Sequence, residues 1–351
     1  MIGELPALRE DAAAWDAFVT DAPTCSYPQL SAWATVKAAN GWDAERVVAG
    51  TPSGPIGAQV LLHRIGATPW SMGYAPRGPL ASRFDGDAVR SFTAATRDFA
   101  ARHRLSHVMI DPEISDPEVA GQLREAGWRP ATSVQPDRTW VVDLDVPEEA
   151  VWAGLRSKWR QYVQKARRRG VVVVEGDATM FDEFYGVFVE TARRAGFLYR
   201  TLDSYRRVYD AFASNGGARL LFARLPDGTA GATIMLVACG PRVVEPYGGM
   251  TSAGADMRAN YLLKWEAIRS SRERGARIYD MWGMAHPGIE QFKRGFGGRE
   301  VRYIGAWDLV RTPAVRGMLL LGQRLRVAIA RRRYGRYRDG RTPDGAGVAD
   351  T

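Results

Sequence analysis

Apolar and polar residues follow two periods along this chain, one typical of helices and one typical of strands. Apolar residues three or four apart predict amphipathic helices, and short apolar runs bounded by Gly, Pro or Asp predict strands. In the first half these patterns predict helices over 11–19, 31–39, 87–102 and 117–125, and strands over 44–48, 56–63, 69–74, 107–111 and 139–144. This mixture predicts an α/β (α+β) fold.

The second half of the chain repeats this order of elements. A long basic helix opens at Pro147 and is expected to end near Gly170, because Gly terminates helices. Further helices are predicted over 181–193, 204–213, 257–274 and through Lys293, with strands over 171–175, 218–224, 230–238, 243–248, 277–282 and 301–309. A last helix over 313–333 is expected to pack back on the first half, and the Gly/Asp/Pro-rich residues 335–351 are expected to be disordered.

Three local similarities suggest that the two halves are duplicates. The matching segments are 106–111 with 276–280, 123–128 with 292–296, and 73–74 with 247–248. They recur at a nearly constant distance along the chain, which is typical of a repeated unit. A chance match of common strand–helix order is the alternative. With 351 residues and about 150 residues per domain, we expect two domains, over 1–145 and 146–309, with 310–334 returning to the first.

The composition is that of a globular protein, with 46% apolar and 25% charged residues. No apolar run reaches the ~18 residues of a membrane span, and the first ten residues do not resemble a signal peptide. Two cysteines, Cys25 and Cys239, are too few for a disulfide framework or a zinc site. A reducing, cytoplasmic location is the simplest interpretation.

The net charge of +9 favours a polyanionic partner. Residues 155–170 contain seven basic residues and no acidic one, with Trp159 and Tyr162 between them. The usual opposite-charge pairs of a solvated helix are therefore missing, which favours contact with nucleic-acid phosphates. A solvated helix face is the alternative. The candidate phosphate contacts are Arg156, Lys158, Arg160, Lys165, Arg167 and Arg168.

Motifs for nucleophilic catalysis, nucleotide binding and metal binding are missing from the sequence. Two other features bear on chemistry. The segment Gly73-Tyr-Ala-Pro-Arg-Gly-Pro79 predicts a rigid loop that either holds a ligand or is a structural turn. Further on, Phe292 and Phe296 flank Lys293 in a Gly-rich turn. A lysine fixed by aromatic residues can stabilise an oxyanion or a phosphate, and a solvent-exposed lysine is the alternative.

These motifs together resemble those of the FemABX family, over roughly residues 25–310. The motifs are Tyr74-Ala-Pro-Arg-Gly-Pro79, the helix of 155–170, Tyr279-Asp-Met-Trp-Gly283 and Phe292-Lys-Arg-Gly-Phe-Gly-Gly298. The resemblance implies two tandem GNAT (acyl-CoA N-acyltransferase-like) domains, with the C-terminal helix on the first domain. Lys165 is followed almost directly by the strand at 171–175, so no coiled-coil arm is expected, as in compact FemX-like members.

The resemblance implies an aminoacyltransferase of peptidoglycan and cell-wall synthesis. It would move Gly, Ala or Ser from aminoacyl-tRNA to the stem-peptide amine of a precursor, either UDP-MurNAc-pentapeptide or its lipid-linked form. The aminoacyl ester is already activated, so no covalent enzyme intermediate, cofactor or metal is expected. Lys293 is the implied catalytic residue, with Phe292 beside it. Asp111 either orients the attacking amine or is structural.

The resemblance also implies substrate-binding residues. Lys37 and Arg200 match the cations with which the family binds the precursor, and a diphosphate needs such cations. Tyr74, Tyr205 and Tyr247 are the expected hydrogen-bonding or stacking partners. The basic helix would bind the tRNA. We further expect a monomer, with a membrane-surface contact through the basic amphipathic C-terminal helix.

Three other functions remain open. A CoA-dependent N-acetyltransferase would share the fold, but Thr251–Arg258, where its pyrophosphate loop should lie, contains one Gly and one Asp and makes a poor cradle. An aminoacyl-tRNA-dependent ligase acting on a natural-product amine would share the chemistry. An RNA-binding module would use the basic helix without catalysis.

Overall fold

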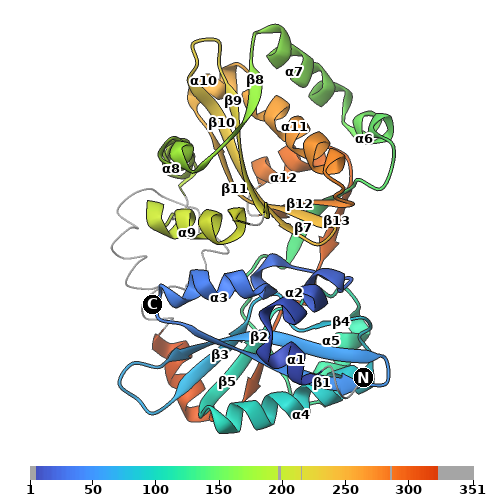
Figure 1. The fold of residues 1–351 in the computed structure, drawn as a ribbon, viewed down its shortest axis with the longest axis vertical. Helices are drawn as coiled ribbons and strands as arrows, with labels where there is room; N and C mark the ends of the chain where they lie inside the picture. The colour runs from blue at the N-terminus through green and yellow to red at the C-terminus, as the bar shows by residue number, and fades with distance from the viewer. Residues whose placement is uncertain (1–4, 197–198, 215, 285–286, 323–351) are drawn as a thin grey trace. The chain divides into compact units, whose positions relative to one another are not determined.

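The computed structural model describes residues 5–196, 199–214, 216–284 and 287–322 of the chain (Figure 1). The contacts between residues divide it into two units. The first comprises the described residues up to Asp137 and from Tyr303 onward, and the second comprises Arg138–Arg302. No helix in this described part combines the length and the apolarity needed to cross a bilayer.

The first unit is built on a seven-stranded sheet of order β1-β2-β3-β5-β14-β6, with β4 paired to β2. Its strands are β1 (Asp43–Thr51), β2 (Gly54–Arg64), β3 (Ser71–Ala75), β4 (Leu80–Ala81), β5 (Leu105–Ile110), β6 (Arg129–Ala131) and β14 (Ala306–Val310). Its helices are α1 (Leu5–Glu10), α2 (Ala12–Asp21), α3 (Ser31–Ala38), α4 (Gly86–Arg102) and α5 (Pro117–Glu125), with a 3₁₀ turn η2 (Tyr27–Gln29). The core lies where α4 and α5 cover the sheet with Phe92, Phe99 and Leu123.

The second unit has a sheet of order β13-β7-β12-β11-β10-β9-β8. Its strands are β7 (Arg138–Asp143), β8 (Val172–Gly176), β9 (Ala218–Arg224), β10 (Ala230–Cys239), β11 (Arg242–Met250), β12 (Ile278–Gly283) and β13 (Arg299–Arg302). Its helices are α6 (Glu148–Gly154), α7 (Ser157–Arg168), α8 (Phe181–Ala195), α9 (Leu202–Ala213), α10 (Ser252–Asp256), α11 (Ala259–Glu273) and α12 (Pro287–Arg294), with a 3₁₀ turn η3 (Ala178–Met180). Helices α7 and α11 lie on one face of the sheet, and α8 and α9 lie on the other (Figure 1).

The two sheets have the same internal order. An antiparallel meander of three strands, β1-β2-β3 or β9-β10-β11, leads through a helix, α4 or α11, to a strand parallel to the last one, β5 or β12. This shared order is what the predicted duplication would produce, and the fold is the predicted α/β one. After Lys165 the chain passes from α7 to β8 within a few residues, so the described part of the second unit has no coiled-coil arm.

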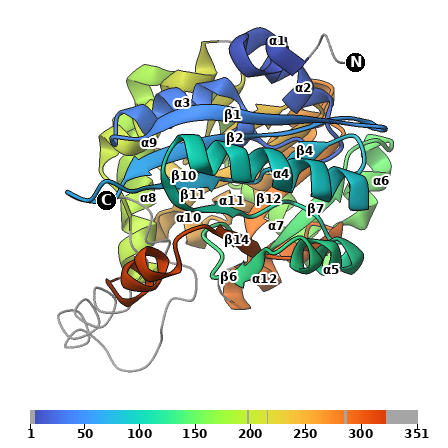
Figure 2. The same cartoon turned by 90° about the horizontal axis from the view of Figure 1, so that it is seen from below.

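Each half of the sequence contributes one strand to the sheet that is built mainly from the other half. β7 follows β6 in the chain but pairs with β12 and β13. β14 follows β13 in the chain but pairs with β5 and with β6, which lies beside it in Figure 2. The prediction of one strand over 301–309 was therefore wrong. The chain turns at Gly305, which has a φ of +78° that favours glycine, and the segment contributes one strand to each sheet.

The predicted continuous helix from Pro147 to Gly170 was also wrong. It is two helices, α6 and α7, separated by Leu155 and Arg156 in extended conformation. Leu155 is buried in the core of the second unit, which its extended backbone allows. Arg160 on α7 donates from Nη1 to the carbonyl oxygens of Ala153 (2.8 Å) and Leu155 (2.7 Å), and so caps the end of α6.

The C-terminal helix is described from residue 313 to residue 322. Its Arg316 forms a buried ion pair with Asp308 of β14 at 2.5 Å, which fixes the start of this helix against the sheet of the first unit. The rest of the predicted helix, to 334, and the predicted disordered tail of 335–351 lie outside the described residues.

Candidate active site

The ammonium group of Lys293, on α12, is bound by three consecutive backbone carbonyl groups. Its Nζ donates to the oxygens of Met281 (2.6 Å), Trp282 (3.2 Å) and Gly283 (2.5 Å) at the end of β12. All three N–H bonds of an ammonium are thereby engaged. Lys293 is therefore not the solvent-exposed lysine that the sequence left as an alternative. Its ammonium group lies at the end of β12, against the backbone.

A second lysine lies near the first. Lys264 of α11 is 2% exposed and pairs with Glu245 of β11, whose carboxylate also accepts the hydroxyl of Tyr279 at 2.6 Å. Burial, and then repulsion from Lys264, lower the pKa of Lys293 to about 8, while the carboxylates of Glu245 and Asp280 oppose this shift. Lys293 therefore titrates close to neutrality, as catalytic lysines commonly do.

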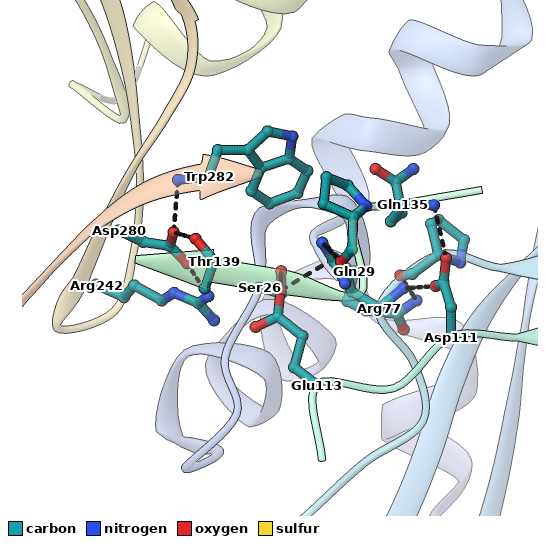
Figure 3. A network of polar contacts seen from close by, with 12 residues as sticks. Ser26, Gln29, Arg77, Asp111, Glu113, Gln135, Thr139, Arg242, Asp280 and Trp282 are labelled. Atoms are coloured by element: carbon teal, nitrogen blue, oxygen red, sulfur yellow. Dashed lines mark hydrogen bonds and ion pairs between the residues drawn. The ribbon is translucent and has the colours of Figure 1, made fainter. Parts of the chain in front are cut away.

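Asp280 of β12 anchors the backbone beside this cage. Its carboxylate is fully buried and accepts hydrogen bonds from the Thr139 hydroxyl, the Arg242 guanidinium and, at 2.7 Å, the backbone N–H of Trp282 (Figure 3). Burial alone would raise the pKa of Asp280, but Arg242 and these hydrogen bonds lower it below the usual value. The site therefore contains a stable carboxylate two residues before Trp282.

The turn that carries Lys293 is held by aromatic packing. The ring of Phe292 meets those of Tyr261 and Phe296 edge to face, each with centroids 5.1 Å apart. Trp159 of α7 donates from Nε1 to the carbonyl oxygen of Phe292 at 3.0 Å. A Cβ on Gly295 would lie 2.1 Å from the Trp159 ring, so glycine is required there.

The basic helix and the lysine turn are thus physically joined, although they lie far apart in the sequence. Besides the Trp159 contact, the backbone N–H of Arg156 donates to the carbonyl oxygen of Gly295 at 2.9 Å. Trp159 is consequently buried and unavailable for stacking on a nucleotide. The N-terminus of α7 lies directly beside the turn that carries Lys293.

The six candidate phosphate contacts differ in their surroundings. Arg160 caps α6, and Arg167 forms an ion pair of 2.6 Å with Glu266. Lys165 is half-buried, whereas Arg156, Lys158 and Arg168 are exposed. The Lys158 ammonium lies 5.7 Å from the centroid of Tyr162. The exposed basic face of α7 is therefore smaller than the sequence suggested.

Three of the predicted substrate-binding residues are brought together in the second unit. The Tyr205 hydroxyl accepts the backbone N–H of Arg200 at 3.1 Å, and the rings of Tyr205 and Tyr247 meet edge to face at 4.9 Å. Phe188 packs against both rings. Burial raises the pKa of Tyr205 to about 12, so its hydroxyl stays protonated. The side chain of Arg200 is exposed beside this aromatic cluster.

In the first unit, Asp111 organises the loop after β3. Its carboxylate accepts the Tyr74 hydroxyl at 2.7 Å. It also accepts the backbone N–H groups of Arg77 at 2.6 Å and of Gln135 at 3.3 Å (Figure 3). Burial raises the pKa of Asp111, and Arg77 partly offsets this rise. Arg77 itself is buried and pairs with Glu113 at 3.0 Å. Both carboxylate oxygens are engaged, which favours the structural role of Asp111 over an orienting role.

Lys37 lies apart from this network on α3. It is buried, and its ammonium is 5.6 Å from the centroid of the Trp33 ring. The nearby Gln29 donates to the carbonyl oxygen of Pro76 at 2.7 Å and accepts the backbone N–H of Gln59 at 2.7 Å. This amide ties the segment before α3 to the Tyr74–Arg77 loop.

Several residues of these networks were missed from the sequence. Lys264 and Glu245 lie in segments whose apolar pattern marks them only as core, and Gln29 and Glu113 belong to no motif. Asp280 had one signal, its correspondence with Asp111 in the duplicated halves. In the described part of the chain, no group of three or more His, Cys, Asp or Glu side chains is placed to hold a metal ion.

Two protein families match parts of this chain. Residues 11–125 match the FemAB family, and residues 153–294 match the family described as Acetyltransferase (GNAT) domain. The Lipid II:glycine glycyltransferase of Staphylococcus epidermidis is 22% identical over 375 residues, covering 84% of this chain and 90% of the relative. The Staphylococcus aureus protein of the same name is 25% identical over 222 residues, covering 60% of this chain and 53% of its own length.

Solved structures share the fold. The crystal structure of FemX superimposes with a TM-score of 0.81 at 20% identity, covering 88% of this chain and 98% of FemX. The C-terminal domain of a putative lysylphosphatidylglycerol synthetase from Agrobacterium fabrum gives a TM-score of 0.50 at 15% identity, covering 89% and 95%. The two units have the predicted GNAT-like fold, and the match to the GNAT family lies within the second unit.

Replacing Gly295 by Ala is expected to destabilise the second unit by about 1–3 kcal/mol, because the new Cβ would overlap the Trp159 ring. The free energy of unfolding, measured with urea, checks this. Gly186→Ala is the matched control: Gly186 lies in α8 with open space around it, so alanine there should leave stability unchanged or raise it by up to about 1 kcal/mol. Equal stabilities of the two variants would contradict the packing described here.

Asp111→Asn should destabilise the first unit by about 1–3 kcal/mol. The NH₂ group of the asparagine would replace one of the two acceptor oxygens and would face the N–H group of Arg77 or Gln135 without accepting from it. Thermal unfolding would measure this loss. Asp98→Asn, an exposed change on α4, should alter stability by less than about 0.5 kcal/mol. An Asp111→Asn protein of unchanged stability that binds its ligand poorly would instead give this carboxylate a direct role.

Proposed function

Because this chain belongs to the FemABX family and is an acyltransferase, we propose that it transfers an amino acid from aminoacyl-tRNA to the stem-peptide amine of a peptidoglycan precursor. The relatives named Lipid II:glycine glycyltransferase support an aminoacyl transfer to such a precursor. The net charge of +9 suits two anionic substrates, a tRNA and a diphosphate-bearing precursor. Glycine, alanine and serine are the amino acids expected from the family resemblance.

The proposed reaction joins an amine to an activated ester. The neutral amine attacks the ester carbonyl carbon, and the C–N bond forms as an oxyanion develops on the carbonyl oxygen. The intermediate then collapses, the ester C–O bond breaks, and the terminal hydroxyl of the tRNA leaves with the proton that the amine gives up. The protein must hold both substrates in line and stabilise the oxyanion.

The caged ammonium of Lys293 is the observation that carries this proposal. A charge held by fixed backbone dipoles near the surface of a packed core needs little reorganisation when an oxyanion forms. The contact to the Trp282 oxygen, at 3.2 Å, is the longest of the three. It is therefore the contact that a developing oxyanion would replace. Phe292 supports this role by packing the turn that carries Lys293.

The remaining residues would bind the substrates. Arg200, beside the Tyr205 and Tyr247 rings, offers an exposed guanidinium for a phosphate and aromatic surface for a base or sugar. Lys37, the other cation that the family resemblance implies for the precursor, is buried in the first unit. Arg156, Lys158 and Arg168 on the exposed face of α7 would contact the tRNA backbone.

A CoA-dependent reaction is the alternative that the GNAT match raises. Such enzymes bind pyrophosphate with free backbone amides at the start of the helix equivalent to α11. Here the amides of Gly254, Ala255 and Met257 bond to groups within their own turn. Gly254 is also packed against the carbonyl of Gly231, where a Cβ would lie 1.8 Å away. This arrangement supports a donor other than CoA.

One incubation tests the proposed function. The protein is mixed with charged tRNAs and, separately, with the soluble precursor, its lipid-linked form and simple amines, and the products are analysed by mass. An amide product that depends on charged tRNA and on a precursor supports the proposal. A product formed from acetyl-CoA, from an amine outside the cell wall, or no product with any acceptor despite tRNA binding would favour one of the other three functions.

Lys293→Met should lower the rate of transfer by at least about 100-fold without unfolding the protein, because an oxyanion stabiliser is lost. In the parent, the ammonium is the active form and its pKa is about 8. This contribution is therefore complete at pH values well below 8 and is lost as the pH rises through about 8. The pH dependence of the rate measures this limb. Arg299→Met, an exposed change on β13, should keep both rate and pH profile.

Charge reversal at Lys158 or Arg168 should weaken tRNA binding and flatten its salt dependence. The slope of log K against log salt should fall by roughly 0.7–0.9 for each phosphate that the protein no longer neutralises. Filter binding or anisotropy at several salt concentrations would measure the slope. Arg129→Glu, an equal charge change at an exposed position of the first unit, is the control. If all three variants gave one slope, α7 would be an ordinary solvated helix face.

A further inference from the structure

The cage around Lys293 requires an unusual backbone. Successive carbonyl groups of a β-strand point to opposite sides, so three consecutive ones cannot face a single cation in a regular strand. Met281, Trp282 and Gly283 nevertheless all accept from Lys293. The backbone is turned at Trp282, which has a φ of +58°, in the left-handed region that a bulky side chain rarely adopts.

Sheet pairing makes room for this turn. β12 pairs with β7 at Asp280, opposite Val141, and again at Gly283, opposite Thr139. Three steps along β12 therefore match two steps along β7, which is a β-bulge of one residue. On its other edge, β12 pairs with β11 only as far as Asp280. The carbonyl groups after Asp280 are thus released from the ladder on that edge.

A positive φ at a tryptophan persists only where its surroundings hold it. The Asp280 carboxylate accepts the Trp282 N–H at 2.7 Å and so closes a turn two residues long. The carboxylate is itself fixed by Thr139 on β7 and Arg242 on β11. It therefore ties the bulge to strands on both sides.

We infer that Asp280 is a positioning residue for Lys293: by accepting the Trp282 N–H it holds the bulge that turns three carbonyl groups toward the Lys293 ammonium. This inference rests on the role proposed above for Lys293. Asp280 does not contact the ammonium in this arrangement; it acts through the backbone of residues 281–283 and through its negative charge.

Substitutions at Asp280 can separate the effect of its negative charge from the effect of its hydrogen bond to the Trp282 N–H. Asn retains an oxygen that can accept the Trp282 N–H but removes the charge, whereas Ala removes both. The charged groups that face Lys293 are Lys264 from α11, Glu245 from β11 and Asp280 from its own strand. Loss of the Asp280 charge should therefore lower the pKa of Lys293, and the basic limb of the transfer rate should move to lower pH.

Substitution at Trp282 separates backbone from side chain. Both Gly and Ala remove the indole, but only Gly adopts a positive φ without strain. If the backbone turn is what matters, Trp282→Gly should retain more transfer activity than Trp282→Ala. Equal losses, or a larger loss for Gly, would mean that the ring or general stability matters instead. If the Asp280 variants fail to fold, this comparison of the two Trp282 variants still tests the inference.

A second readout does not depend on transfer. Reductive methylation labels neutral amines, and mass spectrometry reports each lysine separately; the exposed Lys158 serves as the internal reference. We expect Asp280→Ala and Trp282→Ala to label Lys293 faster relative to Lys158, by about tenfold for each unit by which its pKa falls. Asp308→Asn is the matched control, because it breaks a buried ion pair with Arg316 in the first unit; it should lower stability without changing the labelling of Lys293.

The outcomes distinguish the two proposals. Unchanged labelling and an unchanged pH profile in the Asp280 and Trp282 variants would overturn the positioning role, even if Lys293→Met is inactive. If Lys293→Met keeps the parent rate while those variants still alter the labelling of Lys293, the positioning of the ammonium stands and its proposed role in transfer fails. The inference is supported in full when labelling, pH profile and the Gly-over-Ala order all change as described.

Discussion

The geometry of the candidate site depends on holding one ammonium group against the backbone. Removing a lysine from water is costly unless its three donors are satisfied, and here three carbonyl oxygens at the end of β12 satisfy them. Those carbonyl groups are available because β12 leaves the ladder at Asp280 and bulges at Trp282. The same arrangement holds a positive charge at the end of the sheet, where burial and repulsion from Lys264 lower the pKa of Lys293 to about 8.

The glycines and aromatic residues around this ammonium follow from the same constraint. α12 must approach the sheet end closely for Lys293 to reach three carbonyl groups. Gly295 and Gly298 allow that approach, since a Cβ on Gly298 would lie 2.1 Å from the carbonyl oxygen of Val141. Trp159 then fills the space beside Gly295 and binds the carbonyl of Phe292. A basic helix proposed to bind tRNA is thereby anchored to the turn that carries the proposed catalytic group.

Local patterns predicted most of the elements, and the failures have nonlocal causes. The sequence of 147–170 reads as one helix because nothing in its spacing marks Leu155, whose extended backbone serves burial in the core. The apolar pattern of 301–309 is continuous, but β13 and β14 pair with strands of different sheets. For the site, the motif around Lys293 was visible, whereas Lys264 and Glu245 are identified only by folding, which brings α11 onto β11.

The two units share one arrangement, a buried aspartate that holds a backbone turn, and differ in what the turn does. In each, a buried aspartate within or just after the strand that follows the crossover helix accepts the backbone N–H of a non-glycine residue with positive φ. Asp111 holds Arg77, with a φ of +61°, and Asp280 holds Trp282, with a φ of +58°. Each carboxylate also accepts a hydrogen bond from a hydroxyl group, that of Tyr74 for Asp111 and that of Thr139 for Asp280.

The difference lies in what the held residue does. In the first unit the Arg77 guanidinium pairs with Glu113 and donates to the carbonyl oxygen of Pro136, so the arrangement holds neighbouring loops together. In the second unit the turn directs backbone carbonyl groups outward to Lys293, a residue from another element. On the roles proposed above, the same arrangement stabilises a loop in the first unit and positions the Lys293 ammonium in the second. The bulge in β12 allows this because it turns backbone carbonyl groups toward a side chain of another element. This divergence accounts for why the correspondence between the two aspartates was visible in the sequence while their separate roles were not.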